Sequence, residues 1–140
     1  MRTPEDVKQE VELLYELTRD AVPGDWDYAD HTWTYCATSD GRDGAHFNIF
    51  SQRREQPLPN SPESVANMVE SIWADQGHPV KAEYSADFPQ PRWILSDPAW
   101  LAGSGPEGLL VQFTVGDDYA DFSATSRCVA GDLAELSFVE

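Results

Sequence analysis

The sequence predicts an α+β protein with the element order α-β-β-α-β-β-β-β, in which two helices pack on one face of an antiparallel sheet. Two segments with apolar residues at three- and four-residue spacing each follow a helix-capping sequence, and the other segments alternate apolar and polar residues between turn-forming links. Short links between strands favour antiparallel neighbours. Helices that cover one face of such a sheet are the expected layering.

The first helix is predicted at residues 4–21. Thr3 is placed to cap it, Pro4 suits the first helical position, and Glu5 and Asp6 complement the positive end of the helix dipole. The apolar stripe of this helix consists of Val7, Val11, Leu14 and Leu17 or Thr18. Pro23-Gly24 is expected to end it.

The segment Trp33–Arg54 is predicted to be a hairpin with strands at 31–38 and 45–54 and a glycine-containing turn at Ser39–Gly44. Gly24–Asp30, which precedes it, is predicted to be a loop. Strand alternation places one apolar set on a single face, which we expect to be buried: Trp33, Tyr35, Phe47 and Ile49.

A second helix is predicted to start at Ser61-Pro62-Glu63, which repeats the first helix's opening chemistry, and to end at Gly77. Four strands follow, and their predicted ranges are 80–88, 92–96, 109–115 and 119–129. The first of these has the most regular alternation in the chain, and its expected buried face carries Val80, Ala82, Tyr84, Ala86 and Phe88.

Length and charge restrict the function classes. With 140 residues and 15.6 kDa, one domain over residues 1–140 is expected. Nine basic residues against 25 acidic ones give a formal net charge of −16, which argues against binding nucleic acid or an anionic membrane. No apolar stretch approaches the roughly 20 residues of a membrane-spanning helix. The acids are spread along the chain, which is typical of a solubilising surface and also suits a basic partner.

The sequence contains no motif that fits a metal site, a cofactor site or a catalytic site. His31, His46 and His78 occur in no zinc-ligand spacing, and His31 and His46 fall on opposite faces of the predicted hairpin. The glycine pattern at 103–108 precedes a predicted strand rather than a helix, so it does not fit a dinucleotide site. Asp117, Asp118 and Asp121 do not match a calcium loop, and we interpret them as turn formers that also guard a sheet edge. The sequence therefore indicates no cofactor, no metal site and no catalytic residue.

Cys36 and Cys128 are the only cysteines, and each falls in a predicted strand. Two interpretations stay open: a disulfide that joins the first strand to the last, or two buried free thiols that pack as small apolar residues. Strand alternation puts Cys36 on the same face as Thr32, Thr34 and Thr38, whereas Cys128 shares a face with Phe122. A bulge or a register change is needed to bring them together.

Several short motifs resemble small envelope lipoproteins of actinobacteria: Trp33-x-x-Cys36, Ser96-Asp97-Pro98, the glycine Gly108 before a strand, and Ser126-x-Cys128. That group has a helix, a hairpin bearing tryptophan and cysteine, a second helix and a closing strand with a cysteine. The resemblance spans most of the chain and implies an extracytoplasmic domain with a Cys36–Cys128 disulfide. It implies no particular chemistry.

The function expected from the sequence is a non-catalytic, extracytoplasmic binding or interaction domain, with an unidentified protein or small molecule as its partner. The alternative is an acidic cytosolic toxin-immunity or inhibitor protein that binds a basic partner, as the charge of −16 suggests. A third class, an enzyme without a recognisable motif, would have a pocket with convergent polar groups.

Overall fold

The structure is a computed structural model that describes residues 3–54, 58, 60–86, 91–98 and 106–132. Its elements are α1 (Pro4–Ala21), β1 (Asp27–Ala37), β2 (Asp43–Arg53), α2 (Pro62–Asp75), β3 (Glu83–Ser85), β4 (Arg92–Asp97), the short 3-10 helix η1 (Pro106–Gly108), β5 (Leu110–Val115), β6 (Ala120–Thr125) and β7 (Val129–Ala130).

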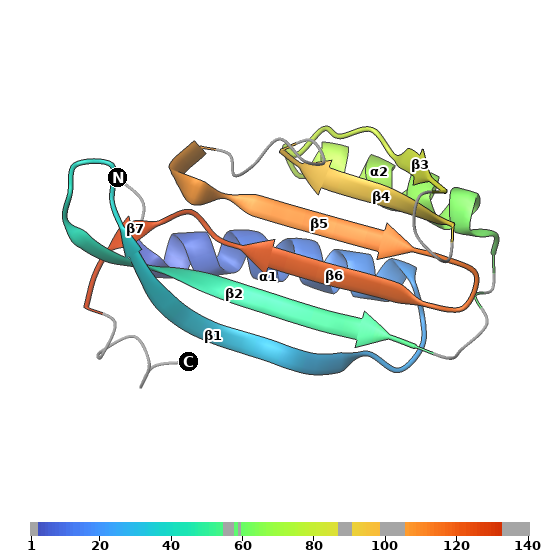
Figure 1. Ribbon diagram of the computed structural model, residues 1–140, viewed down its shortest axis with the longest axis horizontal. Helices are drawn as coiled ribbons and strands as arrows, with labels where there is room; N and C mark the ends of the chain where they lie inside the picture. The colour runs from blue at the N-terminus through green and yellow to red at the C-terminus, as the bar shows by residue number, and fades with distance from the viewer. Residues whose placement is uncertain (1–2, 55–57, 59, 87–90, 99–105, 133–140) are drawn as a thin grey trace.

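The strands form one seven-stranded antiparallel sheet with the order β1-β2-β6-β5-β4-β3, and β7 pairs with the end of β2. Both helices lie behind this sheet in Figure 1, so one face is covered by helices and the other is open. The predicted α+β class and its two-layer arrangement are confirmed.

The helix boundaries follow from their caps. At the start of α1, the Thr3 hydroxyl accepts the Asp6 backbone N–H (3.2 Å), and the Asp6 carboxylate accepts the Thr3 N–H (2.9 Å), which is a capping box. Ser61 caps α2 by accepting the Ser64 N–H (3.2 Å). Proline follows both caps, as the sequence predicted.

The core lies between the helices and the covered sheet face. Alternate residues of β2, β5 and β6 are buried there, as a half-covered sheet requires. The largest fully buried side chains include Trp73, Tyr15, Phe47, Phe113 and Phe122. Trp73 on α2 donates its indole N–H to the Thr18 hydroxyl of α1 (3.0 Å), so a buried hydrogen bond joins the two helices.

Two expectations for the first hairpin are wrong. β1 begins at Asp27, inside the segment predicted to be a loop, because pairing with β2 holds the backbone although aspartate is a poor strand former. Tyr35 was expected in the core but is 58% exposed. It lies near the end of edge strand β1, and its hydroxyl donates to the carboxylate of exposed Asp43 (3.2 Å).

The strand predicted at 80–88 is also wrong in extent, since β3 covers only Glu83–Ser85 and Phe88 lies outside the described residues. β3 is an edge strand that pairs with β4 alone. Just before it, the Ala82 N–H donates to the Glu70 carboxylate of α2 (2.6 Å) instead of to a strand. Tyr84, expected to be buried, is 56% exposed and packs beside Trp93.

Asp117 and Asp118 lie in the turn between β5 and β6, as predicted, whereas Asp121 lies in β6, and none of the three guards a sheet edge. β6 lies between β2 and β5 in the middle of the sheet, and the edges are β1 and β3. The local sequence contains the turn but no information on where its strands sit in the sheet, which is why this interpretation was wrong.

Replacing Thr18 with Val is expected to destabilise the fold by about 2 kcal/mol, because the buried Trp73 N–H loses its acceptor. Denaturant unfolding would measure the loss. In a Trp73→Phe background, which lacks the N–H, Thr18→Val should cost clearly less. Equal costs in both backgrounds would show that this hydrogen bond does not contribute.

Candidate functional site

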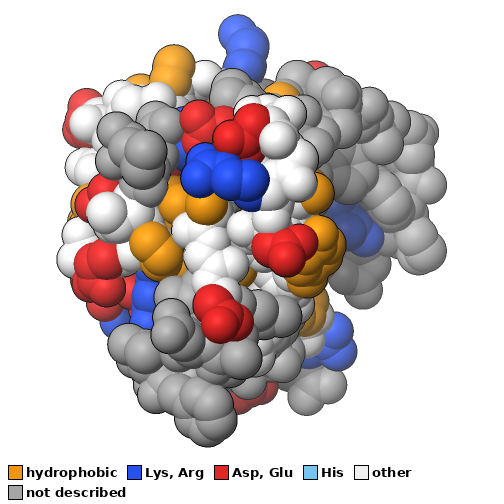
Figure 2. All heavy atoms as spheres, turned by 90° about the vertical axis from the view of Figure 1, so that its left-hand side faces the viewer, with side chains coloured by type: hydrophobic (Ala, Val, Ile, Leu, Met, Phe, Trp, Pro, Cys, Tyr) orange, Lys and Arg blue, Asp and Glu red, His pale blue; other side chains and the backbone are white. Residues whose placement is uncertain are grey.

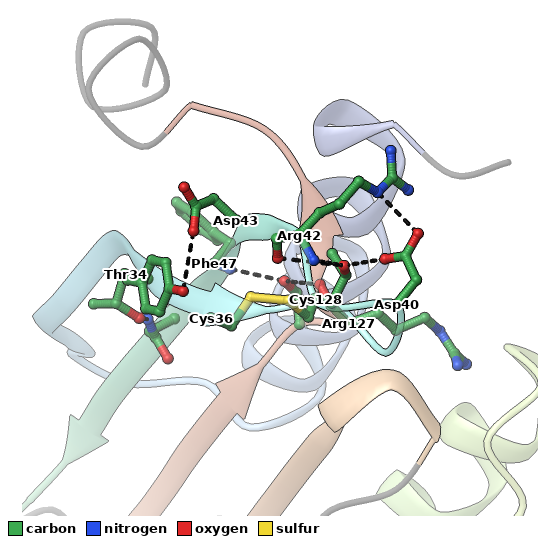
Figure 3. Close-up of a disulfide and its surroundings, with 12 residues drawn as sticks. Thr34, Cys36, Asp40, Arg42, Asp43, Phe47, Arg127 and Cys128 are labelled. Atoms are coloured by element: carbon green, nitrogen blue, oxygen red, sulfur yellow. Dashed lines mark hydrogen bonds and ion pairs between the residues drawn. A yellow bond between two sulfur atoms is a disulfide. The ribbon is translucent and has the colours of Figure 1, made fainter.

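The candidate site lies around a disulfide at one end of the open sheet face. Cys36, near the end of β1, and Cys128, just before β7, are joined, with their Cα atoms 6.1 Å apart (Figure 3). The sequence left this pairing open against two free thiols, and the resemblance implied it.

A register shift removes the conflict of faces that alternation had raised for Cys128. β6 pairs Thr125 with Asn48, whereas β7 pairs Val129 with Ala45, so the chain advances four residues while β2 advances three. Ser126 and Arg127 therefore both oppose Phe47, which is a β-bulge. The extra residue moves Cys128 from the covered face to the open face, where Cys36 lies.

The predicted continuous strand 119–129 is thus broken after Thr125, and hydrogen bonds stabilise the break. The Ser126 N–H donates to the Phe47 carbonyl (2.8 Å), and the Phe47 N–H donates back to the Ser126 hydroxyl (2.7 Å) (Figure 3). The serine side chain takes the place of a ladder carbonyl, so the buried Phe47 N–H stays satisfied. The Cys128 N–H donates to the Glu107 carbonyl of η1 (2.7 Å).

Gly44 shows how closely β7 approaches β2. A Cβ on Gly44 would lie 2.6 Å from the Val129 carbonyl oxygen and 3.2 Å from the Cys128 sulfur. Any larger residue would push β7 and the disulfide away from β2. Glycine is required here by space rather than by backbone angle.

An open hollow of about 840 Å³ lies beside the disulfide. Its lining includes the disulfide itself, Leu110 of β5, and the segment Cys128–Ala130, which we call the wall. Its exposed rim is formed by the turn between β1 and β2 and by Glu107 of η1, which adopts a left-handed backbone conformation (φ 57°). The hollow thus combines apolar lining residues with a polar rim, as many small-molecule sites do.

The turn on this rim is held by its own polar groups. The Thr38 hydroxyl donates to the Asp40 carboxylate and accepts the Arg42 N–H (3.0 Å), and Arg42 Nε donates to Asp40 (2.9 Å). The hydrogen bond from Thr38, together with the Arg42 charge, lowers the pKa of Asp40. The rim therefore presents a paired carboxylate and guanidinium.

His46 lies on the open face of β2 and lines the hollow. Partial burial lowers its pKa, so the imidazole is neutral at pH 7 and can both donate and accept hydrogen bonds. His31 lies on the covered face instead, where it pairs with Glu12 (3.2 Å) and packs edge-on against Phe47. The opposite faces predicted for the two histidines are confirmed, and the described residues contain no group of three metal ligands.

Polar side chains extend this open face across three strands. Asn48 of β2 donates to the Thr34 hydroxyl of β1 (2.7 Å) and accepts from the Thr125 hydroxyl of β6 (3.1 Å). Thr125 also lines the hollow. These hydrogen bonds fix the orientation of the polar groups that border the site.

Behind the bulge, on the helix side, four charged side chains form a chain that we call the ion chain: Asp97, His78, Glu10 and Arg127. His78 Nδ1 contacts the Asp97 carboxylate (2.7 Å), and its Nε2 contacts the Glu10 carboxylate (3.3 Å). Arg127 Nε contacts the same Glu10 carboxylate (3.1 Å). His78 is only 4% exposed, so these contacts are largely shielded from water.

The pKa values within the ion chain follow from these contacts. Hydrogen bonds from His78 and Arg127 lower the pKa of Glu10 to about 2, although burial opposes the change. The Glu10 and Asp97 carboxylates raise the pKa of His78 against the effect of burial. The two carboxylates therefore favour the protonated imidazole, which suits an ion pair that links α1, the segment after α2, and β4.

Sequence reasoning did not find the ion chain. The sequence predicts Glu10 to be one of many acids on the polar face of the first helix. Asp97 and Arg127 are distant from it along the chain. The sequence around His78 predicts only a structural or solvated histidine, with a metal ligand as the alternative. The pattern had no local signal, because its members meet only after the sheet has formed.

Comparison of the chain with protein-family models, with curated proteins and with solved structures finds no match. Among the described residues, no helix has the length and apolarity needed to cross a bilayer. The site must therefore be interpreted from its own geometry.

Replacing both cysteines, Cys36→Ser with Cys128→Ser, is expected to lower the free energy of unfolding by about 4 kcal/mol, because the disulfide closes a long loop. Denaturant unfolding with and without reductant would measure it. Reductant should cause a similar loss in the wild type and none in the double variant. Two thiols that alkylate freely in air-oxidised wild-type protein would contradict the bond.

Proposed function

We propose that this protein is a non-catalytic binding domain that works in an oxidising, extracytoplasmic compartment and takes its ligand in the hollow beside the disulfide. The observation that carries this proposal is the hollow itself, about 840 Å³ in size, with apolar lining residues and hydrogen-bonded polar groups on its rim. Such concave sites with a few fixed polar groups are typical of ligand binding.

The chemistry of the lining favours recognition over catalysis. Neutral His46 offers one donor and one acceptor to a ligand, and Asp40 and Arg42 already neutralise each other on the rim. The disulfide removes the two sulfurs as nucleophiles. A small, largely uncharged ligand with both apolar and hydrogen-bonding parts fits this combination.

The disulfide supports the compartment part of the proposal. Structural disulfides persist in oxidising environments and are rare where thiols are kept reduced. A lipoprotein-like domain at the cell envelope, as the sequence resemblance implies, agrees with that chemistry.

Binding in the hollow can be tested by titrating a library of small uncharged molecules into labelled protein and following amide chemical shifts by NMR. Ligands should shift amides of the turn at 38–42, of His46 and of residues 107–110. His46→Trp, which fills the hollow, should weaken them at least tenfold. Gln52→Trp, on the same face of β2 but outside the hollow, should leave their affinity unchanged. Ligands that map elsewhere, or that bind both variants equally, would contradict the site.

A second candidate function is an acidic inhibitor or toxin-immunity protein in the cytosol that neutralises a basic partner. The net charge of −16 favours it. Figure 2 shows acidic side chains scattered over the end of the molecule that carries the turn between β1 and β2, rather than gathered in one patch. A basic partner would therefore meet a diffuse negative field.

This second function predicts that purified basic proteins bind the chain at low salt and that their affinity falls at least tenfold when salt is raised to about 0.5 M, because screening removes exposed charge attraction. Calorimetry at both salt concentrations would measure it. His46→Trp should not affect such binding. No binding at low salt would count against this function and leave the first one standing.

A further inference from the structure

We propose that the ion chain makes the wall of the hollow sensitive to pH: when His78 loses its proton, the bulge and the following segment Cys128–Ala130 loosen. This inference rests on the proposed function in one respect, namely that the wall belongs to a ligand-binding site. The coupling itself is a property of the ligand-free fold.

The geometry favours a doubly protonated imidazole. Both ring nitrogens of His78 face carboxylate oxygens, Asp97 on β4 at 2.7 Å and Glu10 on α1 at 3.3 Å. A neutral imidazole has one N–H, so deprotonation leaves one of the two carboxylates facing a nitrogen lone pair. Among the described residues, these two carboxylates are the charged groups in ion-pair contact with the ring, and Arg127 contacts the far side of the pair through Glu10.

The other end of the ion chain is attached to the wall. Arg127 holds Glu10 through Nε (3.1 Å) and Nη2 (3.5 Å), and the residue after it is Cys128, which lines the hollow. Arg127 is also the second residue of the bulge opposite Phe47. A displaced Glu10 carboxylate therefore acts on the backbone that carries the disulfide.

The position of His78 allows little adjustment without this displacement. Its backbone N–H donates to the Trp73 carbonyl at the end of α2 (2.9 Å), and its side chain is almost fully buried. Asp97 lies at the end of β4, where it pairs with Val111 of β5. His78 is thus held in place, whereas the side chains of Glu10 and Asp97 are 26% and 30% exposed. A change at His78 therefore acts on these two carboxylates and, through Glu10, on the bulge.

The direction of the effect follows from the two pKa shifts. The pKa of His78 is raised above its ordinary value of 6.5, so its stabilisation is complete below pH 6.5 and is lost as pH rises through the raised pKa. The pKa of Glu10 is lowered from 4.5 to about 2, so its contribution is complete above pH 4.5 and is lost as pH falls toward 2. The wall should be tightest between about pH 4.5 and 6.5 and should loosen on the alkaline side.

Hydrogen exchange followed by NMR would measure this in the ligand-free protein. The protection factors of the Ser126 and Cys128 amides, which bond to Phe47 and Glu107, should fall at least fivefold as His78 deprotonates. The Gly116 amide, which bonds to Tyr119 in the turn between β5 and β6, serves as an internal control and should not change. The side-chain titration of His78 should have the same midpoint as the loss of protection.

Two variants test the assignment to His78. His78→Gln should give low protection of Ser126 and Cys128 from pH 4.5 upward and should lack the alkaline transition. His31→Gln, which removes a comparable histidine contact to α1 at Glu12, should keep the wild-type transition. A transition that persists in His78→Gln, or that disappears in His31→Gln, would overturn the proposal.

If His78→Gln does not fold, Asp97→Asn provides a second test of the coupling. Without the Asp97 charge the pKa of His78 should fall, and the midpoint of the protection change should move to lower pH by the same amount. A shifted His78 titration with an unshifted protection change would refute the coupling. A protein that shows the coupling but binds no ligand would contradict the proposed function alone.

Discussion

The bulge at Ser126 and Arg127 is the constraint on which the candidate site depends. Two residues oppose Phe47, so every side chain after them changes face relative to β6. Cys128 comes to the open face, where the disulfide with Cys36 forms, and Val129 opposes Ala45 on the covered face. A regular strand would place Cys128 against the core and leave the disulfide impossible without backbone movement.

A bulge interrupts ladder bonding, and this protein offsets that cost at three separate points. The Ser126 hydroxyl accepts the Phe47 N–H, the disulfide ties the following residue to β1, and Arg127 pairs with Glu10 on α1. The disulfide acts from the open face and the ion chain from the helix side. The segment is therefore held from both faces of the sheet, although β7 itself is only two residues long.

Sequence patterns predicted the features that depend on neighbouring residues. Both helices, their caps at Thr3 and Ser61, and the hairpin core around Phe47 follow from local spacing, and the structure agrees. Local patterns did not predict how far the edge strands extend. β1 is longer than predicted, because pairing with β2 includes Asp27 and Asp30. β3 is shorter than predicted, and just before it the Ala82 N–H bonds to Glu70 instead of to a strand. The bulge appeared in the sequence only as an inconsistency between the faces of the two cysteines, because a register depends on the partner strand.

The ion chain could not be predicted from the sequence because its members come together only when the strands pair. The bulge also explains why the ion chain lies next to the hollow. In an extended segment, neighbouring side chains point to opposite faces, so once Cys128 faces the open side, Arg127 faces α1. The hollow in front of the sheet and the buried His78 behind it are thus joined through two consecutive residues. Arg127, on the helix side, is bonded directly to Cys128 in the wall of the hollow, and the disulfide joins Cys128 to β1. A change of charge at His78 can therefore displace the wall through these covalent bonds.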